Sequence, residues 1–143
     1  MKPKVLFLCT HNAVRSQMAE AFLRRYAGDR FEVYSAGLEP TQVHPYAKLV
    51  MEELGFDMTG FHAKGLHQWL GTMHFGYLIT VCSKAQELCP IFPGVAVRLY
   101  WPFDDPLEFV GTEQERLAKF REVRDEIDER IRTWLEELET SGQ

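Results

Sequence analysis

Short apolar runs alternate with amphipathic segments along the chain. Four runs predict strands, at residues 5–8, 31–37, 77–82 and 95–100. The first run is wholly apolar, as in a central parallel strand that is covered on both faces. Strands that alternate with helices form parallel sheets with right-handed crossovers. The pattern therefore predicts an α/β fold, with a four-stranded parallel sheet flanked by helices.

Two helices are predicted between these strands. Residues 16–27 are amphipathic and are followed by Gly28, a helix-stop residue. A second helix is predicted to begin near Pro45, which suits a first helical turn, and to end at Gly55. Its expected apolar face contains Val50, Met51 and Leu54.

The last helix has the clearest signals. Thr112 and Glu115 fit a capping box at its start. Apolar residues then follow at steps of three or four, with Glu and Arg on the opposite, solvated face: Leu117, Phe120, Val123, Ile127, Ile131, Trp134 and Leu138. The segment 57–75 is ambiguous, although Leu66, Trp69 and Leu70 suggest a helical turn or two.

Length and charge narrow the class of protein. Residues 1–143 are expected to form a single domain with a substantial core. The net charge is −5 and no basic block is present, which argues against nucleic acid as a partner. The apolar run after Lys4 is too short for a signal or membrane segment. We therefore expect a cytoplasmic protein, in which three cysteines indicate chemistry more than a disulfide scaffold.

The most informative residues follow the first predicted strand. Five residues separate Cys9 from Arg15, and Ser16 opens the next helix. A loop of this length can wrap a tetrahedral oxyanion between a nucleophilic thiolate and a bidentate guanidinium, beside the free N–H groups of a helix N-terminus. The expected oxyanion-binding loop consists of Thr10, His11, Asn12, Ala13, Val14, Arg15 and Ser16.

Individual loop residues suggest their own roles. Asn12 tolerates left-handed backbone geometry, so we expect it to hold the shape of the loop. His11 could add positive charge or line the mouth of the pocket. The Ser16 hydroxyl and Arg15 could both stabilise the Cys9 thiolate.

Other chemical groups lie after later strands. Asp105, stiffened by Pro106, is a candidate proton donor for a leaving oxygen, although Asp104 or Asp105 could simply form a turn. Six residues separate Cys82 from Cys89, and the two are either structural thiols or a redox relay. Zinc sites favour tighter cysteine pairs with four ligands, so no metal site is expected. Ligands bind at the carboxyl ends of parallel strands, where these residues are predicted to converge.

The segment from Cys9 to Glu20 resembles the signature of the low-molecular-weight protein tyrosine phosphatase fold. It is most similar to the thioredoxin-coupled arsenate reductases on that fold. The resemblance covers nearly the full chain and includes these further motifs: Ser35-Ala-Gly37, Cys82-x6-Cys89-Pro90, Phe103-Asp-Asp105-Pro106, Gly111-Thr-Glu and Val123-Arg-Asp-Glu-Ile127.

The resemblance implies a three-thiol mechanism with no bound cofactor. Cys9 would attack arsenate held by Arg15 and the loop amides, while Asp105 protonates the departing oxygen. Cys82 would then attack the Cys9 sulfur and release arsenite. Cys89 would attack Cys82, leaving a Cys82–Cys89 disulfide for thioredoxin, the implied partner and electron donor, to reduce. The implied role is arsenic detoxification and resistance.

The sequence departs from the family pattern within the loop and at one residue that is expected to support it. His11, Ala13 and Val14 stand where the family usually carries Gly, Ser and Cys. Some members bind potassium through residues that match Asn12, Glu20 and Ser35, together with an Asp; here Lys64 falls near the place of the Asp. We expect Lys64 to replace the cation by bonding Glu20 or Asn12, so that loop support comes from Asn12, Ser16, Glu20, Ser35 and Lys64.

Three other functions remain open. A phosphatase acting on aryl phosphates through a Cys9 phosphoenzyme needs Arg15 and Asp105 but neither Cys82 nor Cys89. Leu107 also stands where phosphatases of the fold usually carry a substrate-facing Tyr. A non-enzymatic arsenic oxyanion sensor would not need Asp105, and a structural interaction protein would need none of these groups.

Overall fold

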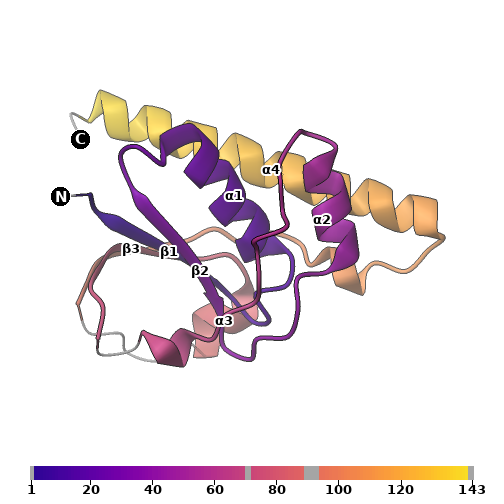
Figure 1. Cartoon of the computed structure of the whole chain (residues 1–143), viewed down its shortest axis with the longest axis horizontal. Helices are drawn as coiled ribbons and strands as arrows, with labels where there is room; N and C mark the ends of the chain where they lie inside the picture. The colour runs from indigo at the N-terminus through magenta and orange to yellow at the C-terminus, as the bar shows by residue number, and fades with distance from the viewer. Residues whose placement is uncertain (1, 70–71, 89–93, 142–143) are drawn as a thin grey trace.

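A computed structural model describes residues 2–69, 72–88 and 94–141. The sheet has four strands, all paired in parallel in the order β2-β1-β3-β4, which confirms the predicted sheet (Figure 1). The strands are β1 (Lys4–Cys9), β2 (Glu32–Gly37), β3 (Phe75–Thr80) and β4 (Val95–Tyr100).

Helices complete the crossovers between the strands. The α-helices are α1 (Arg15–Ala27), α2 (Pro45–Glu52), α3 (Ser83–Leu88) and α4 (Glu113–Thr140), and the 3₁₀ turns are η1 (Leu66–Gln68) and η2 (Pro106–Glu108). In Figure 1, α4 runs along the length of the molecule, and it packs against α1 and α2. Its apolar stripe supplies fully buried core residues, Phe120, Val123, Ile127 and Ile131.

The predicted capping box at the start of α4 is confirmed. Thr112 Oγ1 accepts a hydrogen bond from Glu115 N at 3.2 Å, and Glu115 Oε1 accepts one from Thr112 N at 3.0 Å. Two otherwise unpaired N–H groups of the first turn region are thereby satisfied. This local signal fixes where a 28-residue helix begins.

Two predicted ends are wrong, and β3 begins at Phe75, two residues before the predicted start at residue 77. Helix α2 ends at Glu52, and the chain then turns through Gly55 with a φ of +84°. Leu54 therefore lies in the turn and is 41% exposed, instead of sharing the buried face of Val50 and Met51. Strand β3 ends at Thr80 instead of residue 82, because the Cys82 carbonyl accepts from Gln86 N and already belongs to the turn that opens α3.

The ambiguous segment before β3 is mostly irregular. Leu66 is fully buried at the start of η1, as its apolar character suggests. Leu70 lies outside the described residues. Within the described ranges, no helix is long and apolar enough to cross a membrane.

The register of the sheet brings its chemical groups to one edge. Cys9 pairs with Gly37, Leu8 pairs with Thr80, and Thr80 pairs with Tyr100. The carboxyl ends of all four strands therefore lie side by side. Cys9, Cys82 and the segment after Tyr100 emerge at this edge, where open α/β sheets bind ligands.

Candidate active site

The sulfur of Cys9 lies at the base of the loop that joins β1 to α1. Cys9 ends the strand, Arg15 begins the helix, and the cysteine is only 3% exposed. Its Sγ atom accepts a hydrogen bond from Asn12 N at 3.2 Å and lies 2.9 Å from Ser16 Oγ. A backbone donor, a hydroxyl and the N-terminus of α1 thus surround the sulfur.

Asn12 sets the shape of the loop. Its φ of +54° is in the left-handed region, which an Asn tolerates better than most residues. Its Nδ2 donates to Ser16 Oγ at 2.7 Å and to Ser35 Oγ at 3.0 Å. Ser35 Oγ in turn donates to Glu20 Oε1. This buried chain of hydrogen bonds ties the loop to both α1 and β2.

Lys64 lies behind the same network. Its backbone N donates to Asn12 Oδ1 at 2.8 Å, and its Nζ donates to His62 O at 2.9 Å and lies 3.5 Å from Glu20 Oε1. Burial lowers the pKa of Lys64, and the Glu20 carboxylate opposes that shift. The ammonium therefore faces the buried Glu20 carboxylate directly.

Gly37 permits the β2 backbone to approach the loop. A Cβ atom at this position would lie 2.8 Å from both Asn12 N and Thr10 O, closer than real Cβ contacts. Leu38 N and Glu39 N, just beyond it, donate to Cys9 O and Thr10 O at 3.2 and 2.8 Å. The end of β2 and the two residues after it therefore hold the backbone of the loop in place.

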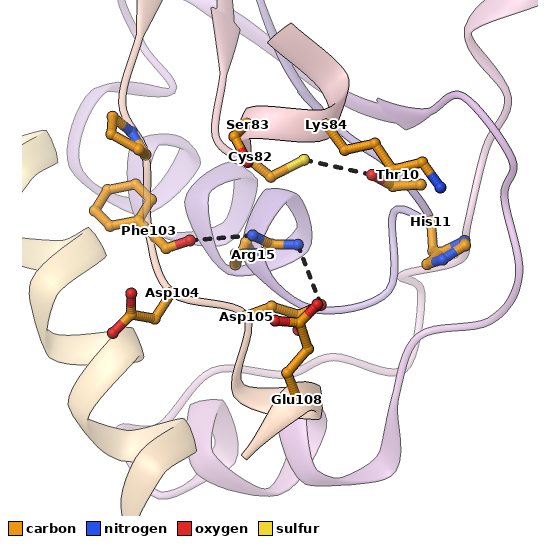
Figure 2. A pocket seen from close by; sticks show the side chains of 11 residues that line it. Thr10, His11, Arg15, Cys82, Ser83, Lys84, Phe103, Asp104, Asp105 and Glu108 are labelled. Atoms are coloured by element: carbon orange, nitrogen blue, oxygen red, sulfur yellow. Dashed lines mark hydrogen bonds and ion pairs between the residues drawn. The ribbon is translucent and has the colours of Figure 1, made fainter. Parts of the chain in front are cut away.

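The segment after β4 brings Asp105 to Arg15. Arg15 Nη1 donates to Phe103 O at 3.0 Å, and Nη2 lies 3.5 Å from Asp105 Oδ2. Asp105 Oδ1 accepts from Leu107 N at 3.0 Å and so caps η2. Figure 2 shows Asp105 turned toward Arg15, whereas Asp104 is turned toward α4.

These groups open onto a cavity of about 430 Å³. Figure 2 shows its lining, which comes from the loop, the start of α3 and the segment after β4: Thr10, His11, Arg15, Cys82, Ser83, Lys84, Pro102, Phe103, Asp104, Asp105 and Glu108. Cys82 lies in this wall, 96% buried, with its Sγ 3.4 Å from Thr10 Oγ1. A second thiol therefore shares a cavity with the arginine of the loop.

The structure brings most of the sequence-predicted site residues together. Thr10, Cys82 and Asp105 line the cavity together with His11 and Arg15. Cys9, Ala13 and Val14 line a small second hollow, which shares His11, Arg15 and Asp105 with the cavity. Glu20, Ser35 and Lys64 support the loop from behind. His11 lies at the mouth, where its Nδ1 is 3.0 Å from Glu39 O. Cys89 lies outside the described residues.

Sequence reasoning missed two supporting groups. Gln17 Nε2 donates to Asn12 O, Asn12 Oδ1 and His62 O, each at 2.9 Å. Gln17 is a polar residue in the first turn of α1, a helix that is buried on nearly every side, and this position was the signal that could have identified it. The carbonyl of Phe103, which holds Arg15, carries no side-chain signal. Among the described residues, no cluster of three metal-ligating side chains is present.

Known proteins share this architecture. An arsenate reductase of Halalkalibacterium halodurans is 42% identical over 135 residues, which is 94% of this chain and 96% of that protein. A solved arsenate reductase in the phosphate binding state superposes with a TM-score of 0.79 at 31% identity, covering 96% of this chain and 98% of the other.

A thioredoxin-dependent arsenate reductase of Corynebacterium glutamicum is also similar. It is 33% identical, with a TM-score of 0.70, over 98% of this chain and 63% of that one. The model of low molecular weight phosphotyrosine protein phosphatases matches residues 4–143. The chain therefore belongs to the low molecular weight phosphotyrosine protein phosphatase family.

Proposed function

We propose that this protein is an arsenate reductase that works through a relay of Cys9, Cys82 and Cys89. One observation carries the proposal: a second buried thiol, Cys82, shares the cavity of the oxyanion loop and lies one hydrogen bond from Thr10. Hydrolysis of a phosphate ester needs no such thiol. The relatives at about 40% identity that span nearly the whole chain are arsenate reductases, which agrees with this function.

The first step is the attack of the Cys9 thiolate on arsenate. Arg15 and the N–H groups at the start of α1 hold the equatorial oxygens. A sulfur–arsenic bond forms and an oxygen leaves as water, with its proton supplied by Asp105. The oxyanion replaces Asp105 at Arg15, which leaves the Asp105 carboxyl free to face the leaving oxygen.

The second step moves electrons to arsenic. The Cys82 thiolate attacks the Cys9 sulfur and forms a Cys9–Cys82 disulfide. The electron pair of the broken sulfur–arsenic bond stays on arsenic, which leaves as arsenite. Cys89 then attacks the Cys82 sulfur and releases the Cys9 thiolate, so that the two electrons delivered to arsenic are balanced by one Cys82–Cys89 disulfide.

A dithiol protein must reduce that disulfide before the next turnover. We infer that thioredoxin does so, in the cytoplasm, where this activity would serve arsenic resistance. The similarity to a thioredoxin-dependent arsenate reductase supports this partner. No bound cofactor enters the proposed cycle, because the electrons come from thiols.

The experiment measures arsenate-dependent NADPH consumption with thioredoxin and thioredoxin reductase, beside hydrolysis of an aryl phosphate. We expect arsenate reduction by the wild type, none by Cys9→Ser, and loss of multiple turnover in Cys82→Ser and Cys89→Ser. The last two variants should retain any phosphate-ester hydrolysis. Aryl-phosphate hydrolysis without arsenate reduction would instead establish a phosphatase, and phosphate binding with neither activity would fit an oxyanion sensor.

A further inference from the structure

Two adjacent carboxylates at the cavity have different partners. Asp105 faces Arg15, with 3.5 Å between Oδ2 and Nη2. Asp104 Oδ2 instead accepts a hydrogen bond from Lys119 Nζ on α4 at 3.0 Å. Asp104 nevertheless lines the same cavity, and its side chain is 73% exposed. Rotation of that side chain would bring a second negative charge toward the site of an anionic substrate.

Lys119 opposes a cluster of negative charge on this side of the cavity. Its Nζ lies 3.6 Å from Glu122 Oε2 as well as 3.0 Å from Asp104 Oδ2, although the lysine side chain is only 17% exposed. Burial, together with the charges of Glu122 and Asp104, raises the pKa of Glu126, while Lys119 acts in the opposite direction. Asp104 and Glu122 therefore pair with one ammonium group, and Glu126 adds a third negative charge nearby. Without Lys119, the two glutamates of α4 would repel Asp104.

We infer that Lys119 is a positioning residue that holds Asp104 out of the oxyanion pocket. It touches neither the substrate site nor Cys9. Its effect passes through Asp104, whose released carboxylate would compete with the substrate for Arg15 and repel it. Asp105 keeps its own bonds to Leu107 N and Arg15, so Lys119 affects anion affinity more than the chemical step.

The primary test is titration of inorganic phosphate by calorimetry, which does not depend on the proposed arsenate reductase activity. Lys119→Met should weaken phosphate binding roughly two- to fivefold, the scale of a partly exposed ion pair. Lys119→Arg should bind normally. Arg132→Met is the charge-matched control, since it breaks an Arg132–Asp128 pair on the same helix, and it should leave the affinity unchanged.

A double-mutant cycle separates positioning from a general charge effect. Asp104→Asn should change affinity little in the wild type but restore it in the Lys119→Met background. In the arsenate assay the KM should follow the phosphate affinity while kcat stays constant. Additive effects of the two substitutions, unchanged phosphate binding in Lys119→Met, or a loss confined to kcat would each overturn the inference. A wild type that binds phosphate without reducing arsenate would overturn the proposed function alone.

Discussion

Asp105 is predicted to have two roles, pairing with Arg15 and donating a proton. Replacing it with asparagine should therefore raise the affinity for phosphate and slow the chemical step. In the free protein the carboxylate neutralises Arg15, with 3.5 Å between Oδ2 and Nη2 and both side chains largely buried. During the reaction the same group is proposed to protonate the leaving oxygen. Asparagine keeps an Oδ1 atom for the bond from Leu107 N, so η2 stays capped.

The sizes of the two effects follow from this geometry. At 3.5 Å and an effective dielectric constant of about 20, the Coulomb attraction is roughly 5 kcal/mol. Desolvation and competing water reduce the net value of such a pair to about 1 kcal/mol. Because an incoming anion must replace Asp105 at Arg15, Asp105→Asn should bind phosphate about fivefold more tightly. The chemical step should slow by roughly 10²–10⁴-fold, the usual range for a lost general acid.

Calorimetry with phosphate and a single-turnover assay of arsenite release measure the two quantities separately. Asp104→Asn is the matched control, because Asp104 is held by Lys119 and should affect both measurements little. Weaker phosphate binding in Asp105→Asn would mean that the carboxylate does not compete at Arg15. A normal single-turnover rate, or a larger loss in Asp104→Asn, would refute the assignment of Asp105 as the acid.

Three further predictions follow from the surroundings of the loop. Gly37→Ala should abolish phosphate binding because its Cβ meets the loop backbone, whereas Gly60→Ala, with nothing within 4 Å, should be silent; normal binding by Gly37→Ala would contradict this. Because Lys64 Nζ lies beside Glu20 where a cation would bind, exchanging sodium for potassium should not change the melting temperature of the wild type. Lys64→Asp should instead be stabilised by potassium, and stabilisation of the wild type by potassium would contradict this prediction. A helical path over the seven residues from Cys82 to Cys89 would span roughly 10 Å, whereas a disulfide needs Cα atoms within roughly 4.4–6.8 Å. Oxidation should therefore unwind α3 and speed amide hydrogen exchange across residues 83–92; equal protection in both redox states would exclude this unwinding.

Local sequence signals predicted the elements that depend on local physics. The bounds of β4 and the start of α4 agree with the structure, because the turn residue Gly94 directly before the strand and the capping box before the helix act within a few residues. Gly55 was predicted as the stop of α2, and its φ of +84° does turn the chain there. The regular helix nevertheless ends at Glu52, because the last residues before the glycine already belong to the turn, and Leu54 is therefore exposed.

The same distinction between local and distant contacts applies to the candidate site. The residues from Cys9 to Ser16 are consecutive, so their joint chemistry could be predicted from spacing alone. The carbonyl that holds Arg15 belongs to Phe103, 88 positions away, and the ammonium that holds Asp104 belongs to Lys119, 15 positions away. Such pairings depend on how the segment after β4 lies against α1 and α4, which no local pattern encodes.

The structure explains why the loop accepts His11, Ala13 and Val14, which differ from the usual family residues. Ala13 and Val14 are buried, and Ala13 O accepts from His44 N at 3.0 Å, so the backbone of Ala13 has a partner while its methyl group packs. His11 turns its Nδ1 to Glu39 O, outside the network formed by Asn12. The polar side chains that bond within the loop network are Asn12 and Ser16, which match the family motif. The differences at His11, Ala13 and Val14 therefore leave the hydrogen bonds of Asn12 and Ser16 intact.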